Sequence, residues 1–283
     1  MQDAIDRNPM TLSTEELKQQ IIDHHPWHFS VDIRDGIGTS YCYTVDESLL
    51  PHHSGTVTFL EQRSWIHLLL NKIYPDGMAN KSVLDCACNC GAYCFWAKEL
   101  GASRTFGFDV REHWVNQAEF LRKNREADST GMEFKVCDLY DVPKLNLEPA
   151  DFTFFRGIFY HLPDPITGLK VAADLTKEVM YFDTATTHLL GDEKLAGALV
   201  ASVEGTESYM SGVHRLNWYP TGPKVLRHIL DWMGFKEVKV IDLKKGNSPD
   251  NDTGSLANEK GRIGILASKV EGLLGRFDDI PDE

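Results

Sequence analysis

The fold is decided by the stretch at residues 83–91, which reads VLDCACNCG. Its first residues form a short apolar run, typical of a buried strand, that delivers an acid, Asp85, to the strand end. A turn of small residues follows and opens a helix, and Ala87 and Gly91 let the backbone approach a ligand closely. The first turn of that helix offers free N–H groups. Open parallel sheets bind their ligands at such a place, outside the carboxyl ends of the strands.

Strand and helix patterns alternate along the chain around this point. Strands are expected at 82–86, 105–109, 132–138, 152–155 and 178–184, with helices between them at 93–100, 113–126 and 165–175. The alternation predicts β-α-β units and a doubly wound, mostly parallel sheet. Two last strands, at 234–241 and 262–267, are joined by a polar loop and predict an antiparallel C-terminal hairpin. The expected fold class is therefore α/β, with a Rossmann-like sheet of seven strands.

Four segments of the chain are expected to have different roles. They are an N-terminal cover of helices and loops (1–80), a ligand-binding core (81–187), a substrate-side insertion or lid (188–222), and a C-terminal helix and hairpin that complete the sheet (223–283). In the cover, Thr11 or Ser13 is expected to cap a first helix. The stretch at 24–55, rich in His, Tyr, Gly and Pro, predicts loops and short strands, and a second helix is expected at 60–73.

Acids stand at three successive strand ends. Asp109 follows Gly91 by 18 residues and ends the second core strand, where a carboxylate can accept hydrogen bonds from both hydroxyls of a ribose. Asp138 ends the third strand, where an acid can meet an adenine amino group, although an Asp can also simply end a strand. Together with Asp85, these acids would repel the pyrophosphate of a dinucleotide. They suit S-adenosylmethionine, which has a cationic centre and no phosphate, better than NAD.

Residues 81–187 resemble the class I S-adenosylmethionine-dependent methyltransferases. Within that family, the similarity points to the branch of tRNA wobble-uridine carboxymethyl and methoxy methyltransferases and related small-molecule and sugar O-methyltransferases. The residues that carry it are DCACNCGAY at 85–93, GA at 101–102, GFD at 107–109 and GIFYHLPDP at 157–165. Flanking similarity lies in PWHF at 26–29, DG at 35–36 and WYP at 218–220, so the resemblance covers roughly residues 24–242.

The resemblance implies S-adenosylmethionine as cofactor, S-adenosylhomocysteine as product, and a set of cofactor-binding residues. These are Asp85, Ala87, Asn89, Gly91, Tyr93, Asp109, Val110, Asp138, Leu139, Arg156 and Phe159. Phe159 either flanks the cofactor or packs in the core. Two positions depart from the family pattern: Ala87 replaces the usual first glycine, which is tolerable if its φ stays negative, and Cys90 replaces Asp or Gly. The N-terminal aromatic segment is expected to fold over the cofactor.

His161 is the candidate catalytic residue. It follows the fourth strand, where the reactive methyl group should project, and an imidazole suits the deprotonation of an attacking hydroxyl. The alternative is a structural histidine that fixes its own loop by hydrogen bonding. Candidate substrate-binding residues are Tyr160, Asp183, Glu204, Tyr209, Asn217 and Tyr219. Polar groups interleaved with aromatic rings suit a sugar, and a packing lid is the alternative.

The sequence predicts no dedicated metal site. Asp183 is a candidate for the acceptor or, with a second acid, for Mg²⁺, which needs only one or two carboxylates from a protein, so Mg²⁺ stays open. Five histidines read as lining an entrance rather than binding metal: His24, His25, His28, His52 and His53. The six cysteines, four of them crowded at 86–94, are expected to be buried free thiols in a reducing compartment.

Charge and hydropathy restrict the partners. The formal net charge of −13 disfavours a nucleic acid, because such partners are bound mainly by Lys and Arg on phosphates. No apolar run approaches the roughly 18–20 residues that span a bilayer, so a cytoplasmic protein without membrane contact is expected. The predicted function is methyl transfer to a hydroxyl of a small polar acceptor, a sugar or natural product. The alternatives are a tRNA wobble-uridine methyl or carboxymethyl transferase and a non-catalytic cofactor-binding module; the oligomeric state stays open.

Overall fold

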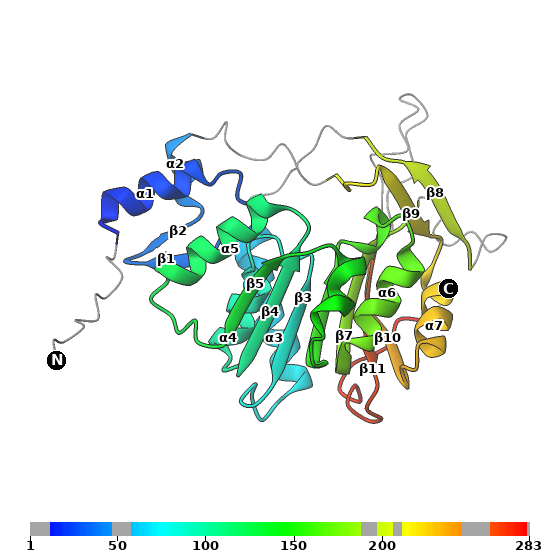
Figure 1. Cartoon of the computed structure of the whole chain (residues 1–283). Coiled ribbons are helices and arrows are strands. Elements are labelled where there is room, and N and C mark those ends of the chain that lie inside the picture. The colour runs from blue at the N-terminus through cyan, green and yellow to red at the C-terminus, as the bar shows by residue number, and fades with distance from the viewer. Residues whose placement is uncertain (1–11, 47–57, 188–196, 206–210, 245–260, 282–283) are drawn as a thin grey trace.

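The computed structural model describes residues 12–46, 58–187, 197–205, 211–244 and 261–281 of the 283-residue chain. A seven-stranded sheet forms the centre of the molecule, with helices on both of its faces (Figure 1). Its strands are β3 (Ser82–Cys86), β4 (Arg104–Asp109), β5 (Met132–Val136), β6 (Ala150–Arg156), β7 (Thr176–Ala185), β10 (Glu237–Lys244) and β11 (Arg262–Ser268).

The strand order is β10-β11-β7-β6-β3-β4-β5. Strands β3 to β7 are parallel, whereas β11 runs antiparallel to both of its neighbours, β7 and β10. The expected fold class and the antiparallel C-terminal hairpin are therefore confirmed. Chain order reverses at β3, because β4 lies on one side of it and β6 on the other. A ligand crevice is expected outside the carboxyl ends of these strands.

Alternating side chains of the central strands build two cores. On β6, Phe154 belongs to the core under α3 (Thr58–Ile73), α4 (Ala92–Glu99) and α5 (Glu112–Asn124). The next residue, Phe155, points to the other face and belongs to the core under α6 (Pro165–Asp174) and α7 (Pro223–Trp232). Both rings are fully buried. Because β6 is apolar on both faces, it reads as a continuous hydrophobic run, as central parallel strands do.

The N-terminal segment packs beside α5, at the left in Figure 1. It consists of α1 (Thr14–Asp23), β1 (Asp32–Arg34), β2 (Ile37–Gly38) and α2 (Tyr41–Val45). Ser13 caps α1 in a capping box: its Oγ accepts from the backbone N–H of Glu16 at 3.3 Å, and the Glu16 carboxylate accepts from the Ser13 N–H at 2.8 Å. Thr11, the other expected cap, lies outside the described residues. The short helix α2 was not predicted.

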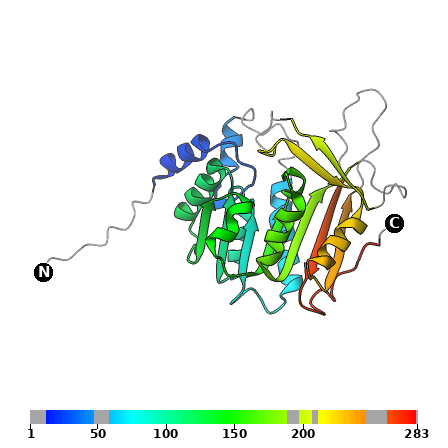
Figure 2. The same ribbon diagram turned by 45° about the vertical axis from the view of Figure 1, so that its right-hand side comes forward.

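A second, two-stranded sheet rises from the carboxyl side of the main sheet, at the upper right in Figure 2. It is an antiparallel hairpin of β8 (Leu199–Val203) and β9 (Leu216–Pro220), tied to the end of β7 by a hydrogen bond from Thr187 N to Pro220 O at 3.3 Å. Two 3-10 helices lie at the same edge of the main sheet: η2 (Leu139–Leu145) after β5 and η3 (Phe159–His161) after β6. The sequence predicted an insertion at 188–222 but did not predict that it contains this hairpin.

The six cysteines are free thiols, as predicted. Five are buried and Cys137 is half-buried. Burial raises the pKa of every one of these thiols, which holds them in the protonated, unreactive form. Within the part of the chain that is described, no helix has the length and apolar character needed to cross a membrane.

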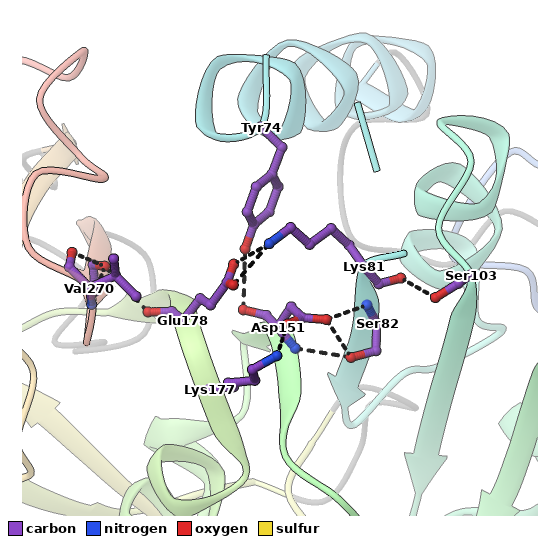
Figure 3. Close-up of polar contacts among 9 residues, drawn as sticks. Tyr74, Lys81, Ser82, Ser103, Asp151, Lys177, Glu178 and Val270 are labelled. Atoms are coloured by element: carbon purple, nitrogen blue, oxygen red, sulfur yellow. Dashed lines mark hydrogen bonds and ion pairs between the residues drawn. The ribbon is translucent and has the colours of Figure 1, made fainter. Parts of the chain in front are cut away.

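Polar side chains connect the amino ends of the central strands, at the edge opposite the expected crevice (Figure 3). The Asp151 carboxylate accepts from the backbone N–H of Ser82 at 2.8 Å, from the Ser82 hydroxyl at 2.9 Å and from Lys177 Nζ at 2.8 Å. Lys81 Nζ lies 2.8 Å from both carboxylate oxygens of Glu178. These contacts join the starts of β3, β6 and β7.

Replacing Asp151 with asparagine is expected to destabilise the fold at pH 7 by about 1–3 kcal/mol, because the half-buried N–H of Ser82 loses its charged acceptor. Burial raises the pKa of Asp151, but the bonds from Lys177 and Ser82 outweigh burial and leave the pKa below its usual value. The carboxylate therefore stabilises the fold above about pH 4 and loses this contribution as the pH falls through its lowered pKa. Urea unfolding measures the free energy of unfolding of the unmodified protein and of Asp151→Asn at pH 7 and pH 3. The difference between the two proteins should be smaller at pH 3.

The matched control is Asp141→Asn, since among the described residues the ion pair of Asp141 is an exposed one with Lys144, and its loss should change little. An Asp151 variant whose deficit is the same at both pH values would contradict the assigned role of the charge.

Candidate functional site

Asp85 stands near the end of β3 with a buried carboxylate. Its residue is 2% exposed, and its Oδ2 has no hydrogen-bond partner among the described residues. Burial raises the pKa of this carboxyl well above its usual range, repulsion from Asp109 adds to the effect, and Arg156 opposes it. A buried carboxylate oxygen without a partner fits a ligand that supplies a positive charge or a hydrogen-bond donor.

The turn after β3 follows a left-handed path. Ala87 has a φ of +59°, Asn89 of +52° and Gly91 of +78°. The condition under which an alanine is readily tolerated at this position, a negative φ, is therefore not met. The reason is the tightness of the turn: Cys88 N donates to Phe108 O on β4 at 2.8 Å, and Gly91 N donates back to Cys88 O at 2.8 Å.

Ala87→Gly is expected to raise the free energy of unfolding by up to about 1.5 kcal/mol. Removing the strain of an alanine with positive φ stabilises the folded state by about 1–2 kcal/mol. The greater conformational freedom of glycine in the unfolded chain lowers this gain by roughly 0.5–1 kcal/mol. Urea denaturation measures the difference. Ala97→Gly, in the right-handed interior of α4, is the control and should lose about 1 kcal/mol or more. Equal losses in the two variants would contradict the strain at Ala87.

Asp109 ends β4 beside this turn and is held rigidly. Its Oδ2 accepts from the backbone N–H of Asn89 at 3.1 Å, and its Oδ1 from that of Arg111 at 3.0 Å. Burial raises the pKa of Asp109, and these two bonds counteract the rise only in part. Each oxygen keeps a second lone pair, so the carboxylate can accept two further hydrogen bonds from a ligand. The neighbouring Val110 is 41% exposed.

Asp138 caps η2 at the end of β5. Its carboxylate accepts from Tyr140 N at 2.9 Å, which is the structural role that the sequence left open for it. One oxygen also lies 3.9 Å from Nε2 of His214, which lies in the connection between β8 and β9. The next residue, Leu139, is buried beneath this edge.

The remaining candidate cofactor residues surround the turn. Asn89 accepts from Cys90 N at 2.7 Å, and Tyr93 stacks on Phe154 with ring centroids 4.9 Å apart while its hydroxyl accepts from Arg156. Phe159 differs from the rest, because its side chain is fully buried against Phe182. We therefore interpret Phe159 as a packing residue, the second of the two roles considered for it.

The N-terminal aromatic segment packs against the helix that opens after this turn. The ring of Phe29 lies 5.4 Å from Tyr93 and 5.9 Å from Trp96, centroid to centroid. The Gln117 amide on α5 donates to the backbone oxygens of His24 at 2.6 Å and Pro26 at 2.9 Å. The segment thus lies beside the candidate cofactor residues.

Asp183 is engaged by two arginines rather than free for a ligand. Its side chain is 3% exposed; Arg156 Nε lies 3.5 Å from one carboxylate oxygen, and the guanidinium of Arg262 donates to the same group. This differs from the expectation that Asp183 itself reaches an acceptor or Mg²⁺. Arg262 was missed by sequence reasoning, although an antiparallel last strand necessarily begins at the edge where the parallel strands end. Two guanidiniums facing one carboxylate leave the cluster with one excess positive charge.

His161 pairs with a residue of the hairpin. Its Nδ1 lies 2.9 Å from Oε2 of Glu204, and both side chains are largely buried. The Asn217 amide, with its nitrogen turned toward the acceptors, donates to the same Oε2 at 3.2 Å and to the backbone oxygen of Tyr160 at 3.1 Å, and accepts from the Tyr219 hydroxyl at 3.0 Å. Four predicted residues and the candidate base therefore form one cluster. Tyr209 lies outside the described residues.

No group of three or more His, Cys, Asp or Glu side chains is arranged to hold a metal ion in the described ranges. His52 and His53, two of the five histidines considered earlier, lie outside those ranges. A cavity of about 210 Å³ is found elsewhere, at the amino ends of β3 and β4, where Ser82, Arg104 and Gly131 contribute to its lining. None of the candidate residues lines it, because they stand at the opposite ends of the strands.

Comparison with known proteins agrees with this arrangement. Residues 78–239, more than half of the chain, match a family model described as a methyltransferase domain. Two relatives are named tRNA U34 carboxymethyltransferase. The one from Campylobacter jejuni subsp. jejuni is 29% identical over 187 residues, 65% of this chain and 60% of that protein. The one from Aliarcobacter butzleri is 26% identical over 230 residues, 78% of this chain and 71% of that protein.

The match to the Campylobacter protein thus spans about 60% of that relative's length. Among solved structures, the N-terminal domain of EvdMO1 with S-adenosylhomocysteine bound has a TM-score of 0.67 at 16% identity, over 93% of this chain and 99% of that one. This likeness shows a shared fold. From the family model and the sheet order together, the chain belongs to the class I S-adenosylmethionine-dependent methyltransferases, in the methyltransferase domain family.

Proposed function

We propose that this chain binds S-adenosylmethionine at the carboxyl ends of β3, β4 and β5 and transfers its methyl group to a hydroxyl of a small polar acceptor. The observation that carries the proposal is the position of His161, a base candidate that follows β6 at the carboxyl end of the strand paired with β3, which bears Asp85. In this reading, residues 81–187 form the cofactor-binding core, residues 1–80 its cover and residues 188–222 the acceptor-side lid.

The cofactor would be held by groups of different kinds. Asp109 would accept from the ribose hydroxyls, Asp138 and Leu139 would face the adenine, and Asp85, whose Oδ2 lacks a protein partner, would face the positively charged end. The other residues proposed to line the cofactor are Ala87, Asn89, Gly91, Tyr93, Val110 and Arg156. When bound, the cofactor supplies a methyl group on a sulfonium.

Methyl transfer needs an acceptor oxygen held in line with the methyl carbon, about 3 Å away, and relieved of its proton. His161 is proposed as the base that takes this proton. The hairpin β8–β9 would exclude water, since Arg111 next to the cofactor edge donates to the backbone oxygen of Ser211 in the hairpin loop. Positioning, desolvation and proton transfer are then supplied by different elements of the fold.

A small polar acceptor is supported by the side chains around His161. The rings of Tyr160 and Tyr219 lie roughly parallel, with centroids 6.1 Å apart, and Asn217 and Glu204 bring amide and carboxylate groups to the same place. Such a mixture suits a sugar, whose apolar faces contact rings while its hydroxyls meet polar groups. The net charge of −13 supports a small molecule over a nucleic acid.

A second candidate is carboxymethyl transfer to a tRNA wobble uridine. It is favoured by the names of the relatives and by the excess positive charge of the Arg156–Asp183–Arg262 cluster, which suits the carboxylate of a transferred carboxymethyl group. In that case the donor carries a carboxylate on its transferable carbon. Mg²⁺ is not required by either reading and stays open.

Two parallel assays separate the two candidates. One uses S-adenosylmethionine labelled on its methyl group, the other uses the donor that carries a carboxylate on that carbon, and each is offered sugars, natural-product alcohols and unmodified tRNA. Label is expected in a small hydroxyl compound, and filter binding of tRNA at about 150 mM salt should be negligible. Label or a carboxymethyl group on tRNA U34, with tight tRNA binding, would establish the second candidate and overturn the first.

A further inference from the structure

We propose that Glu204 is a positioning residue for His161, so that the base is assembled from the core and the hairpin together. His161 belongs to η3, in the core, whereas Glu204 directly follows β8 of the hairpin. The inference deepens the proposed function, since it assumes that His161 acts as the base. It gives the hairpin a chemical role in addition to covering the site.

The bonds to Glu204 determine which nitrogen of His161 carries the proton. Glu204 Oε2 accepts from the backbone N–H of Gly212 at 2.9 Å and from the Asn217 amide at 3.2 Å, and it lies 2.9 Å from His161 Nδ1. A carboxylate oxygen has only lone pairs to offer, so Nδ1 must donate. In the neutral imidazole the free lone pair is then on Nε2, which has no partner among the described residues. Nε2 is the atom that would take the acceptor's proton.

Gly212 makes this close approach possible. A Cβ at this position would lie 2.8 Å from Glu204 Oε2, 2.8 Å from His161 Cβ and 3.0 Å from His161 Nδ1. A methyl group would therefore push the carboxylate and the imidazole apart without removing either one. Because the φ of Gly212 is not in the left-handed region, an alanine there strains contacts rather than the backbone.

The same hairpin also reaches the strand ends proposed to hold the cofactor. Arg111, next to Asp109, donates to Ser211 O, one residue before Gly212, and Asn217 fixes the backbone of Tyr160, one residue before His161. The hairpin thus contacts the cofactor edge through Ser211 and supplies the Glu204 partner of His161.

The test combines a spectroscopic readout with kinetics. In protein labelled with ¹⁵N-histidine, the His161 signal, assigned through His161→Ala, should report a proton on Nδ1 in the unmodified protein with S-adenosylhomocysteine bound. Glu204→Ala and Gly212→Ala should both weaken or lose this preference and lower kcat by about 10²-fold, with S-adenosylhomocysteine affinity within about twofold. Val203→Ala is the control, because Val203 is the neighbour of Glu204 and is 81% exposed; it should keep both the signal and the rate.

A proton on Nε2 in the unmodified protein would overturn the inference, as would an unchanged kcat in Glu204→Ala or an equal loss in Val203→Ala. The NMR measurement needs no acceptor. If no hydroxyl acceptor is found, the proposed function fails. The NMR spectrum would still show whether Glu204 holds the proton on Nδ1 of His161.

Discussion

Replacing His161 with alanine is expected to lower kcat by about 10²–10⁴-fold, the range over which a positioned acid or base contributes to proton transfer. The affinity for S-adenosylhomocysteine should change by less than about threefold, because the acids proposed to bind the cofactor, Asp85, Asp109 and Asp138, stand at the ends of other strands. Steady-state kinetics with the identified acceptor and calorimetry with S-adenosylhomocysteine measure the two quantities. The imidazole has its Nδ1 engaged by Glu204, so alanine removes the base and leaves a buried carboxylate without one of its donors.

A control histidine separates this effect from a general loss of stability. His228 lies on the exposed face of α7, and His228→Ala should leave both quantities unchanged. If His161→Ala weakens cofactor binding as much as turnover, the alternative holds, and the histidine fixes its loop. A fully active variant would exclude His161 as the base.

Asp109→Ala is expected to lower the affinity for S-adenosylhomocysteine by about 10²–10⁴-fold, effectively abolishing measurable binding. Two ribose hydroxyls would lose a charged acceptor worth about 1.5–3 kcal/mol each, and every 1.4 kcal/mol is tenfold. The backbone N–H groups of Asn89 and Arg111 would lose their acceptor as well, so the turn after β3 would also loosen. Calorimetry measures the change.

The control for this variant is Asp128→Ala. The Asp128 side chain is exposed and is not among the residues proposed to bind the cofactor, so its removal should leave the affinity unchanged. An unchanged affinity in Asp109→Ala would refute the proposed cofactor role. The unmodified protein should also bind more weakly in acid. An ordinary Asp side chain has a pKa of about 4. Because burial raises the pKa of Asp109, the loss of affinity should begin at a higher pH than it would for an ordinary Asp.

The core of the fold was predictable because its strands are buried and regular. Strand β3 was expected at 82–86 and is observed there, and the other six strands overlap their expected ranges with shifts at their ends. Hydrophobic runs alternating with amphipathic helices leave little choice of layer architecture. The acids at strand ends were predictable for the same reason, since a parallel sheet brings all its carboxyl ends to one edge.

The contacts that complete the candidate site were not predictable in the same way. Glu204 and His161 are 43 residues apart, and no local pattern encodes their pairing. The hairpin β8–β9 carries no short turn signal between its strands, and η2 and α2 are too short to show a period. The positive φ of Ala87 could not be predicted either, because alanine normally avoids it; the hydrogen bond from Cys88 to β4 overrides that preference.

The position of β11 has a consequence for synthesis of the protein. Among the seven strands of the sheet this one comes last in the sequence, yet it lies between β7 and β10 and is the sheet partner of β10. Its first residue, Arg262, completes the charge cluster around Asp183. A nascent chain that has not yet released residues 262–268 from the ribosome therefore has neither the strand that joins β10 to the rest of the sheet nor the Arg262–Asp183 ion pair.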